Sequence, residues 1–247
     1  MLLMAKYSPW LLLVGLTAIA GTGGWLIHRQ HQKPAAKKIY QLDLSHLSMP
    51  LDGKVDFRFH TLSAWAAVQV PIAYRFDPPM GTENGGLVYN AQPFWEMNTR
   101  RGGHHTGDDL NGIGGMNSDL GDPVFSAADG IVIYAGEPSA GWGKILIVAH
   151  RLTDGSLLQS MYAHLDAMKV DPGAIVTRGQ MIATVGTANG MYPAHLHFEI
   201  RASDGADIGA GYGFFVFNRL NPAAVVKDKR HSSAEQISPA VLHLKNQ

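Results

Sequence analysis

The segment Pro193-Ala194-His195-Leu196-His197-Phe198-Glu199-Ile200 decides how this sequence is interpreted. Polar and apolar residues alternate along it, a pattern that predicts a half-buried β-strand. Successive side chains of a strand point to opposite faces, so we expect His195, His197 and Glu199 on one face and the apolar residues on the other. The apolar face can enter a core. The opposite face carries two imidazoles that could meet one metal ion or one reacting group.

The composition predicts a folded, β-rich protein. The chain has 247 residues, of which 46% are hydrophobic and 16% charged, enough for one sizeable domain with a smaller appendage or for two modest domains. Its 28 glycines indicate many tight turns. Lysine plus arginine and aspartate plus glutamate both number 20, so the net charge gives no reason to expect a nucleic-acid partner, and we expect none. Cysteine is absent, so any zinc ion would be held by histidine or carboxylate side chains.

Short apolar runs, separated by turns that contain glycine and aspartate, follow residue 122. They recur about every 8–12 residues, a spacing typical of an antiparallel barrel or sandwich. The runs cover residues 131–134, 145–148, 157–162, 174–176 and 181–185, and the histidine strand closes the series. No long helical period interrupts them. The predicted fold class is therefore mostly β, a compact antiparallel sheet or barrel-like domain.

Two other segments supply partners for the histidine strand. In the glycine-rich segment 102–110, His105 and Asp109 are four residues apart, which puts both on one face of a strand or helix, and the glycines argue against a helix. With one imidazole of the later strand they would form a His/His/Asp set, and three protein ligands with an open fourth position are typical of catalytic zinc. His164 also ends a strand-like run. Histidines at three such places favour a shared site over three unrelated core or turn residues.

These motifs together resemble the M23 zinc metallopeptidases, the LytM and lysostaphin type. The resemblance rests on His105-x-Gly107-x-Asp109, Gly121-Asp122-Pro123-Val124, Ala128-Asp129-Gly130, Tyr162-Ala163-His164-Leu165, Val170-x-x-Gly173 with Gly179-Gln180, and His195-Leu196-His197-Phe198-Glu199. Their order and spacing match from about residue 103 to residue 222. The resemblance implies a compact antiparallel β domain that hydrolyses peptide bonds in bacterial cell-wall peptidoglycan, in stem-peptide cross-links or in glycine-containing bridges.

The resemblance also implies roles for five residues. His105, Asp109 and His197 would be the ligands of one zinc ion (Zn2+), with a water at the fourth position. His164 and His195 would be the catalytic pair that moves the protons, and the sequence leaves open which of them is the general base.

Other residues near these motifs receive secondary assignments. Glu199 could orient a ligand imidazole, and Tyr162 could support the pocket. His104 competes with its neighbour His105 as a ligand, but only the His105 register fits the family motif. His150 ends a strand-like run and is expected to be a structural or a surface residue.

Three departures from the family pattern bear on substrate choice. The segment 110–120 is a few residues longer, and residues 189–194 replace a small-residue turn that ends in Gly-Pro. The third departure is that no counterpart of a Phe-Gly-x-Arg stretch precedes His105.

Two other functions compete with that of a peptidase. A non-catalytic relative that binds peptidoglycan or regulates cell-wall hydrolases would be marked by lost ligands, and this chain keeps the ligands and the histidine pair. The segment 170–183 also resembles a lipoyl or biotinyl carrier hairpin, but Lys169 is in the wrong place relative to the glycine turn to be the modified lysine. The expected partner is thus a peptidoglycan peptide, and the oligomeric state stays open.

Residues 10–27 contain no charged side chain, which indicates export. Two interpretations stay open: a membrane-spanning signal anchor, or a signal peptide with Ala18-Ile19-Ala20 as its cleavage site. A buried soluble helix is disfavoured by the glycines of this stretch. Both interpretations predict a cell-envelope protein, periplasmic or extracytoplasmic, and the first adds anchoring in the inner membrane.

The predicted organisation has five parts. They are a signal peptide or membrane anchor (1–29), a basic linker (30–38), an N-terminal extension of unknown role (39–80), an M23-type metallopeptidase domain (81–222) and a polar tail (223–247). Residues 81–103 are rich in Gly, Asn and Pro and are expected to form an irregular approach to the site. Whether residues 39–103 cover the site stays open.

Overall fold

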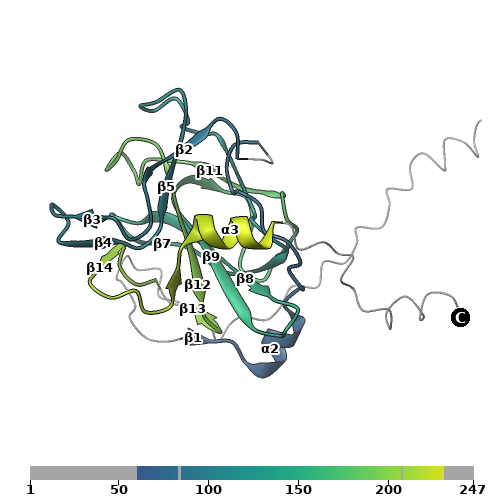
Figure 1. Ribbon diagram of the computed structural model, residues 1–247. Coiled ribbons are helices and arrows are strands. Elements are labelled where there is room, and N and C mark those ends of the chain that lie inside the picture. The colour runs from purple at the N-terminus through teal and green to yellow at the C-terminus, as the bar shows by residue number, and fades with distance from the viewer. Residues whose placement is uncertain (1–59, 83–84, 207, 231–247) are drawn as a thin grey trace, which may run out of the picture. The chain divides into compact units, whose positions relative to one another are not determined.

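The computed structural model describes residues 60–82, 85–206 and 208–230 (Figure 1). Its elements are β1 (His60–Thr61), α2 (Ala64–Gln69), β2 (Val88–Gln92), β3 (Met97–Asn98), β4 (Gly103–His105), β5 (Asp108–Gly112), β6 (Pro123–Phe125), β7 (Gly130–Ser139), β8 (Gly143–Arg151), β9 (Leu157–Met168), β10 (Ile175–Val176), β11 (Met181–Val185), β12 (Leu196–Ala202), β13 (Gly205–Ala206), β14 (Tyr212–Gly213), β15 (Arg219–Leu220) and α3 (Pro222–Lys229). All pairs of these strands are antiparallel. The mostly β, antiparallel fold predicted from the sequence is confirmed.

The largest sheet has ten strands. Its main path runs β10-β7-β8-β9-β12-β5-β2, with β11 paired to β6 and β9, and β15 paired to β12. A three-stranded sheet has the order β14-β4-β3, and β1 pairs with β13. In Figure 1 the three-stranded sheet lies at one end of the described part of the chain, and α3 lies near β12.

The long central strands are buried on both faces. Along β8, Leu146 and Val148 join one apolar cluster, whereas Ile145 and Ile147 join another. The strands β7 and β9 also contribute to both clusters. A strand that is covered on both faces has no solvated side, which explains why residues 145–148 are apolar at every position instead of alternating.

The strand β12 has the alternation that the sequence predicts. Leu196, Phe198 and Ile200 enter the first cluster, with Leu146 and Val148. His197 and Glu199 point to the opposite face, where their side chains contact each other. Because β9 and β5 flank β12 on its two edges, this polar face lies next to residues from both neighbours.

Residues 60–80, the described part of the predicted extension, pack into the same core. The short helix α2 begins after Ser63, whose Oγ accepts a hydrogen bond from the Ala66 amide at 3.1 Å. Val70 and Phe76 are fully buried, and the Phe76 ring lies edge-on to His150 at 5.2 Å between centroids. This stretch therefore contributes to the stability of the main sheet. Residues 39–59 of the extension lie outside the described residues.

The segment 81–103 is more regular than predicted. It contains β2, which pairs with β5, and β3, which pairs with β4. The prediction of an irregular approach is therefore wrong at these positions. Both partners lie further along the chain, so the local Gly, Asn and Pro content does not reveal the pairing.

Both ends of the chain extend beyond the described residues. The expected signal peptide or anchor (1–29) and the basic linker (30–38) lie outside them, as do residues 231–247 of the polar tail. The start of that tail forms most of α3, whose first turn is capped by the Asn221 side chain accepting the Ala224 amide at 3.0 Å. Among the residues that the structure describes, no helix is long and apolar enough to cross a membrane.

Candidate metal centre and active site

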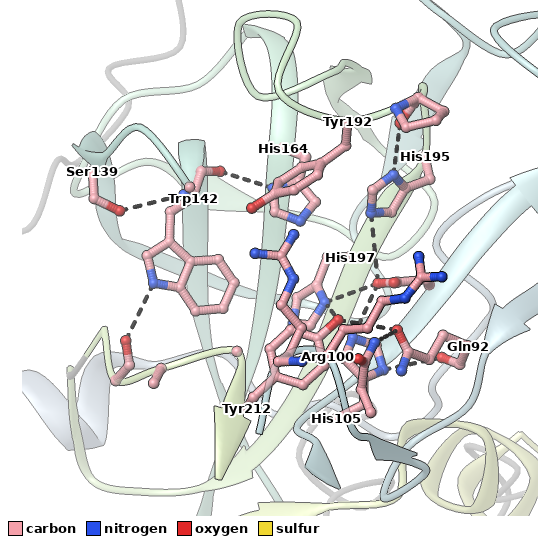
Figure 2. A pocket seen from close by; sticks show the side chains of 18 residues that line it. Gln92, Arg100, His105, Ser139, Trp142, His164, Tyr192, His195, His197 and Tyr212 are labelled. Atoms are coloured by element: carbon pink, nitrogen blue, oxygen red, sulfur yellow. Dashed lines mark hydrogen bonds and ion pairs between the residues drawn. The ribbon is translucent and has the colours of Figure 1, made fainter. Parts of the chain in front are cut away.

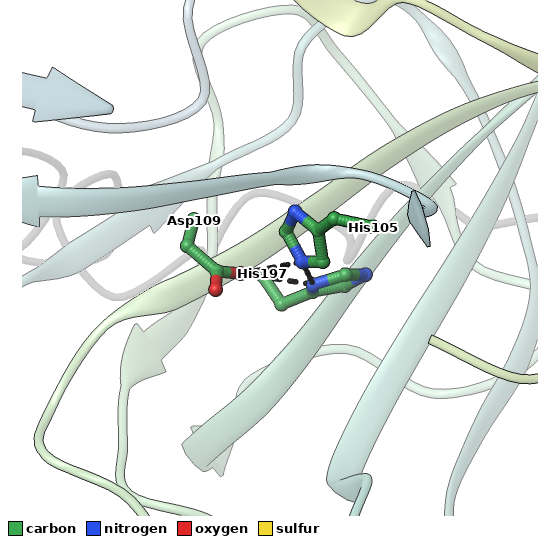
Figure 3. Close-up of side chains that lie close together, drawn as sticks. All are labelled: His105, Asp109 and His197. Atoms are coloured by element: carbon green, nitrogen blue, oxygen red, sulfur yellow. Dashed lines mark hydrogen bonds and ion pairs between the residues drawn. The ribbon is translucent and has the colours of Figure 1, made fainter. Parts of the chain in front are cut away.

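Pairing between two strands brings the predicted ligands together. In the ladder between β12 and β5, His197 lies directly opposite Asp109. The strand β4 precedes β5 by a turn of only Thr106-Gly107, which brings His105 beside that pair. Figure 3 shows the three side chains converging.

The three donor atoms are spaced as ligands of one small cation would be. The distances are 3.0 Å between His105 Nε2 and His197 Nδ1, 2.9 Å between His197 Nδ1 and Asp109 Oδ1, and 3.2 Å between His105 Nε2 and Asp109 Oδ1. Around a tetrahedral zinc with bonds of about 2.0–2.1 Å, ligand atoms lie about 3.3 Å apart. The set therefore fits a zinc ion after a slight expansion.

The other nitrogen of each imidazole is held by a partner behind it. His105 Nδ1 donates to the Gln92 carbonyl at 3.0 Å, and His197 Nε2 donates to Glu199 Oε1 at 3.0 Å. A neutral imidazole has one N–H and one lone pair, so these bonds turn the lone pairs of both rings toward Asp109. Two lone pairs and a carboxylate that face one another at about 3 Å require a positive charge between them.

The electrostatics of the cluster lead to the same conclusion. Burial lowers the pKa of His197, but the hydrogen bonds and charges of Asp109 and Glu199 outweigh burial and raise that pKa to about 9. Burial raises the pKa of Asp109, but hydrogen bonds from His105 and His197 hold it well below its usual range. The cluster thus favours a cation at its centre, whether a proton or a metal ion.

Glu199, which the sequence left without a settled role, supports His197. It is fully buried, and its Oε2 accepts a 2.7 Å hydrogen bond from Arg201 Nε. Thr106 Oγ1 donates to Oε1 at 2.7 Å, and Arg219 Nε lies 3.6 Å from Oε2. Burial raises the pKa of Glu199, but the Arg201 charge and the His197 hydrogen bond hold it well below its usual range, so the carboxylate stays ionised. Arg201 continues the β12 alternation by two residues, a signal that could have identified it.

Two residues next to His105 in the sequence explain why His105, and not His104, faces the cluster. A Cβ on Gly107 would lie 2.5 Å from the Phe198 carbonyl oxygen and 3.0 Å from His197 Nε2, so only glycine lets the β4–β5 turn approach β12 this closely. His104 turns away, because its ring stacks on Trp95 at 4.6 Å and its Nδ1 bonds to the Trp95 carbonyl at 2.9 Å. His104 therefore lies outside the candidate cluster, whereas His105 belongs to it.

A bulge in β9 aims His164 at the same site. In the ladder with β8, Leu146 pairs with Tyr162 and Lys144 with Leu165, so two residues of β9 oppose one residue of β8. His164 has a positive φ of 62°, a conformation that non-glycine residues rarely adopt. Such a bulge changes the direction of a side chain that regular alternation would place on the face of Tyr162.

The expectation that Tyr162 supports the pocket is wrong, because Tyr162 does not line the cavity. Its hydroxyl accepts the Ala127 amide at 2.8 Å and lies 2.9 Å from Ser160 Oγ, inside the apolar cluster.

The two histidines predicted as the catalytic pair face one cavity. Their ring centroids are 4.8 Å apart, and the cavity, of about 600 Å³, is also lined by the three candidate ligands (Figure 2). His164 Nδ1 donates to the Trp142 carbonyl at 3.1 Å and His195 Nδ1 donates to the Pro193 carbonyl at 2.8 Å. Both rings therefore present Nε2 as the free lone pair, and His195 Nε2 lies 3.7 Å from Asp109 Oδ1.

The protonation state of His164 follows from its surroundings. Burial lowers the pKa of His164, and electrostatic interactions with the neighbouring His197 and His195 lower it further, to about 3. His164 is therefore neutral near pH 7, and its Nε2 can accept a hydrogen bond or a proton from a water in the cavity.

Several cavity residues were missed by sequence reasoning. They are Arg100, Arg101, Trp142, Tyr192 and Tyr212. Trp142 donates its indole N–H to the Gly209 carbonyl at 3.2 Å and packs edge-on to His197. Tyr192 belongs to the segment 189–194, in which the sequence departs from the family turn, so that departure changes the cavity wall.

Comparisons with known proteins agree with this architecture. A model described as peptidase family M23 matches residues 105–208. Lipoprotein NlpD of Yersinia enterocolitica is 43% identical over 81 residues, which are 33% of this chain and 78% of that protein. Murein hydrolase activator NlpD of Escherichia coli (strain K12) is also 43% identical over 81 residues, 33% of this chain and 20% of that protein. Peptidoglycan DD-endopeptidase ShyB of Vibrio cholerae is 37% identical over 82 residues, 33% of this chain and 18% of that protein.

The match therefore spans only a fifth or less of the E. coli and Vibrio proteins. It covers most of the Yersinia protein, and the family model extends over the segments that carry the candidate ligands and the histidine pair. On these grounds the chain belongs to peptidase family M23.

Proposed function

We propose that this chain is a zinc metalloendopeptidase that hydrolyses peptide bonds in bacterial cell-wall peptidoglycan, in stem-peptide cross-links or in glycine-containing bridges. One observation carries the proposal: two imidazole lone pairs and a carboxylate meet beside a second pair of histidines at one cavity. Burying such a set is costly unless a cation joins it, and a metal ion bound by all three donors supplies that charge.

In this proposal His105, Asp109 and His197 hold one zinc ion. Neutral nitrogen and carboxylate oxygen are ligands that zinc accepts, and a set of three is typical of its catalytic sites. When bound, zinc polarises the scissile carbonyl and makes water an effective nucleophile near neutral pH. Glu199 and the Gln92 carbonyl keep the two imidazoles in the tautomers that ligation needs.

His164 and His195 move the protons. Both rings line the cavity beside the ligand cluster, where a substrate amide would lie. One ring accepts a proton from the attacking water, and the pair later delivers a proton to the leaving amine. Either N–H or imidazolium so produced also stabilises the negative oxygen that develops on the carbonyl.

A second candidate function is that of a non-catalytic module that binds peptidoglycan or regulates cell-wall hydrolases. The observation in its favour is the 43% identity with a protein named murein hydrolase activator. The intact ligand cluster and histidine pair favour the hydrolase instead, because a binding surface has no need for a buried set of metal donors.

The two functions predict different products from cell-wall sacculi. Purified, zinc-loaded chain is incubated with sacculi, and the released muropeptides are analysed by mass spectrometry with and without a chelator. The hydrolase predicts peptide-cleaved products that disappear with chelator and return with added zinc. Absence of chelator-sensitive cleavage, together with retention on sacculi, would instead favour the binding module.

The proposal also includes a location and a domain division. A peptidoglycan hydrolase acts in the cell envelope, and the uncharged stretch 10–27 supports export or anchoring. We assign residues 81–222 to the catalytic domain, with residues 60–80 folded into its core.

A further inference from the structure

Two exposed arginines line the cavity. Arg100 and Arg101 lie in the turn between β3 and β4, and both line the cavity that also holds the candidate ligands (Figure 2). The turn is fixed, because the Arg101 amide donates to Asn98 Oδ1 at 3.1 Å and β3 pairs with β4 immediately before His105.

Two tyrosine rings hold the Arg101 guanidinium in place. Its Cζ lies 5.3 Å from the centroid of Tyr192 and 5.9 Å from that of Tyr212, so the cation is attracted by both rings. Tyr212 is itself held by a 3.0 Å hydrogen bond from its hydroxyl to Gln92 Oε1. Ring contacts of this kind engage the flat face of a guanidinium and leave its in-plane N–H groups available.

Among the described residues, no carboxylate forms an ion pair with either arginine of the cavity wall. Among the described residues that line the cavity, Asp109 is the one acid, and its charge is already engaged by two imidazoles. A cavity with low-dielectric walls and charge of one sign concentrates ligands of the opposite sign.

We propose that Arg100 and Arg101 bind a free carboxylate of the substrate, beside the scissile bond. The inference rests on the proposed hydrolysis of peptidoglycan peptides and narrows it. A direct cross-link from D-alanine to diaminopimelate carries a carboxylate next to the amide that would be cut, whereas a glycine bridge carries none. The site therefore selects the direct cross-link.

The guanidinium of arginine recognises a carboxylate through a pair of N–H donors. Arginine can bind both oxygens in parallel, whereas lysine supplies only a point charge. If the arginines only supported Tyr192 and Tyr212, replacing them would change the stability of the fold but not the preference between ligands.

The test uses two cross-linked stem-peptide dimers. Both contain diaminopimelate and differ only at its carboxyl group next to the cross-linked amide. That group is a free carboxylate in one dimer and a carboxamide in the other. The binding constants of both are measured by calorimetry on the zinc-loaded full chain carrying His195→Ala, and their kcat/KM values are measured on the chain without that change.

We expect the free carboxylate to bind about tenfold more tightly than the carboxamide, with a preference that decreases as salt is added. In the double variant Arg100→Gln with Arg101→Gln, the two dimers should bind within about twofold of each other, and Arg101→Lys should lose most of the preference. Lys169→Gln is the matched control, because Lys169 is an exposed cation that does not line the cavity. Circular dichroism and zinc content establish that each variant is folded.

The outcomes separate this inference from the proposed function. Equal binding of the two dimers, or a preference that survives the double variant, overturns the carboxylate site even if both dimers are cut. A carboxylate preference in binding without any cleavage keeps the carboxylate site and overturns the hydrolase.

Discussion

His150 and His197 are both almost completely buried, yet their surroundings shift their pKa values in opposite directions. His150, at the end of β8, donates from Nδ1 to the Asp129 carbonyl at 2.8 Å, and its Nε2 accepts from Ser160 Oγ at 2.7 Å. Burial lowers its pKa to about 4 despite the Asp129 contact. His197 has a carboxylate at each ring nitrogen, and its pKa is raised to about 9.

The comparison shows that burial does not distinguish a structural histidine from a functional one. His150 has both nitrogens satisfied by neutral groups, so it is stable as a neutral ring and needs nothing more. His197 has a lone pair that faces another lone pair and a carboxylate, and this arrangement is stable only around a cation. The groups that contact the two ring nitrogens distinguish the two histidines: they are neutral around His150 and anionic around His197.

The largest effect is expected from removing the carboxylate that faces His197. Asp109→Ala leaves two imidazoles without an anionic ligand, so zinc should fall from about one per chain to near zero after dialysis, and cleavage should fall to background. Metal analysis by mass spectrometry measures the stoichiometry. Asp171→Ala, at an exposed position away from the cavity, is the control that should keep the zinc.

The histidine pair should affect turnover without affecting the metal. His164→Ala or His195→Ala removes a proton carrier, for which we expect a loss of about 100- to 10,000-fold in kcat at unchanged zinc content. His104→Ala serves as the control, because that ring stacks on Trp95 and points away from the ligands. Loss of zinc from His195→Ala would show that His195 is a ligand and would refute its assignment here.

The pH dependence of the unfolding free energy tests whether burial lowers the pKa of His150. The pKa of His150 is about 4 in the folded protein and about 6.5 in an unfolded chain, so the unfolded chain binds the proton more tightly. The stability that neutral His150 contributes is present above pH 6.5 and is lost as pH falls toward 4, by about 3 kcal/mol.

Denaturant unfolding at pH 7 and pH 4.5, with chelator present, measures this loss. The drop in unfolding free energy between the two pH values should be smaller in His150→Gln than in the unmodified chain. An equal drop in both proteins would mean that His150 does not titrate as its burial requires.

A smaller effect is expected from the group behind His197. Glu199→Gln keeps the size of the side chain but removes the charge that holds the His197 N–H, so zinc affinity should fall about 10- to 100-fold. Competition with a chromophoric chelator measures that affinity. Thermal unfolding of the metal-free protein runs in parallel, because the change also leaves Arg201 without its carboxylate. An unchanged zinc affinity would remove Glu199 from the metal centre.

The convergence of the candidate ligands could be predicted from sequence, because they lie on regular strands and within the motifs that resemble family M23. Alternation along β12 predicts that His197 and Glu199 share a face. His105 and Asp109, four residues apart, lie in the two short strands β4 and β5, and their side chains face the same cluster. Periodicity of two is a direct consequence of strand geometry, so these positions follow from the order of the residues.

The rest of the cavity depends on irregular structure that no period reveals. The bulge at His164 needs a positive φ at a histidine, so alternation wrongly groups it with Tyr162. Arg101 and Tyr212 come together only because β14 and β3 both pair with β4, which brings distant parts of the chain into one sheet. Tertiary pairing of this kind has no local sequence signal.

The proposed binding of one zinc ion by His105, Asp109 and His197 can be observed by zinc K-edge X-ray absorption on the purified chain at one zinc per chain. We expect a low-coordinate zinc with two imidazole nitrogens and oxygen ligands at about 2.0–2.1 Å, and a spectrum lost in Asp109→Ala. A spectrum fitted by oxygen ligands alone, or one unchanged in Asp109→Ala, would refute this ligand set.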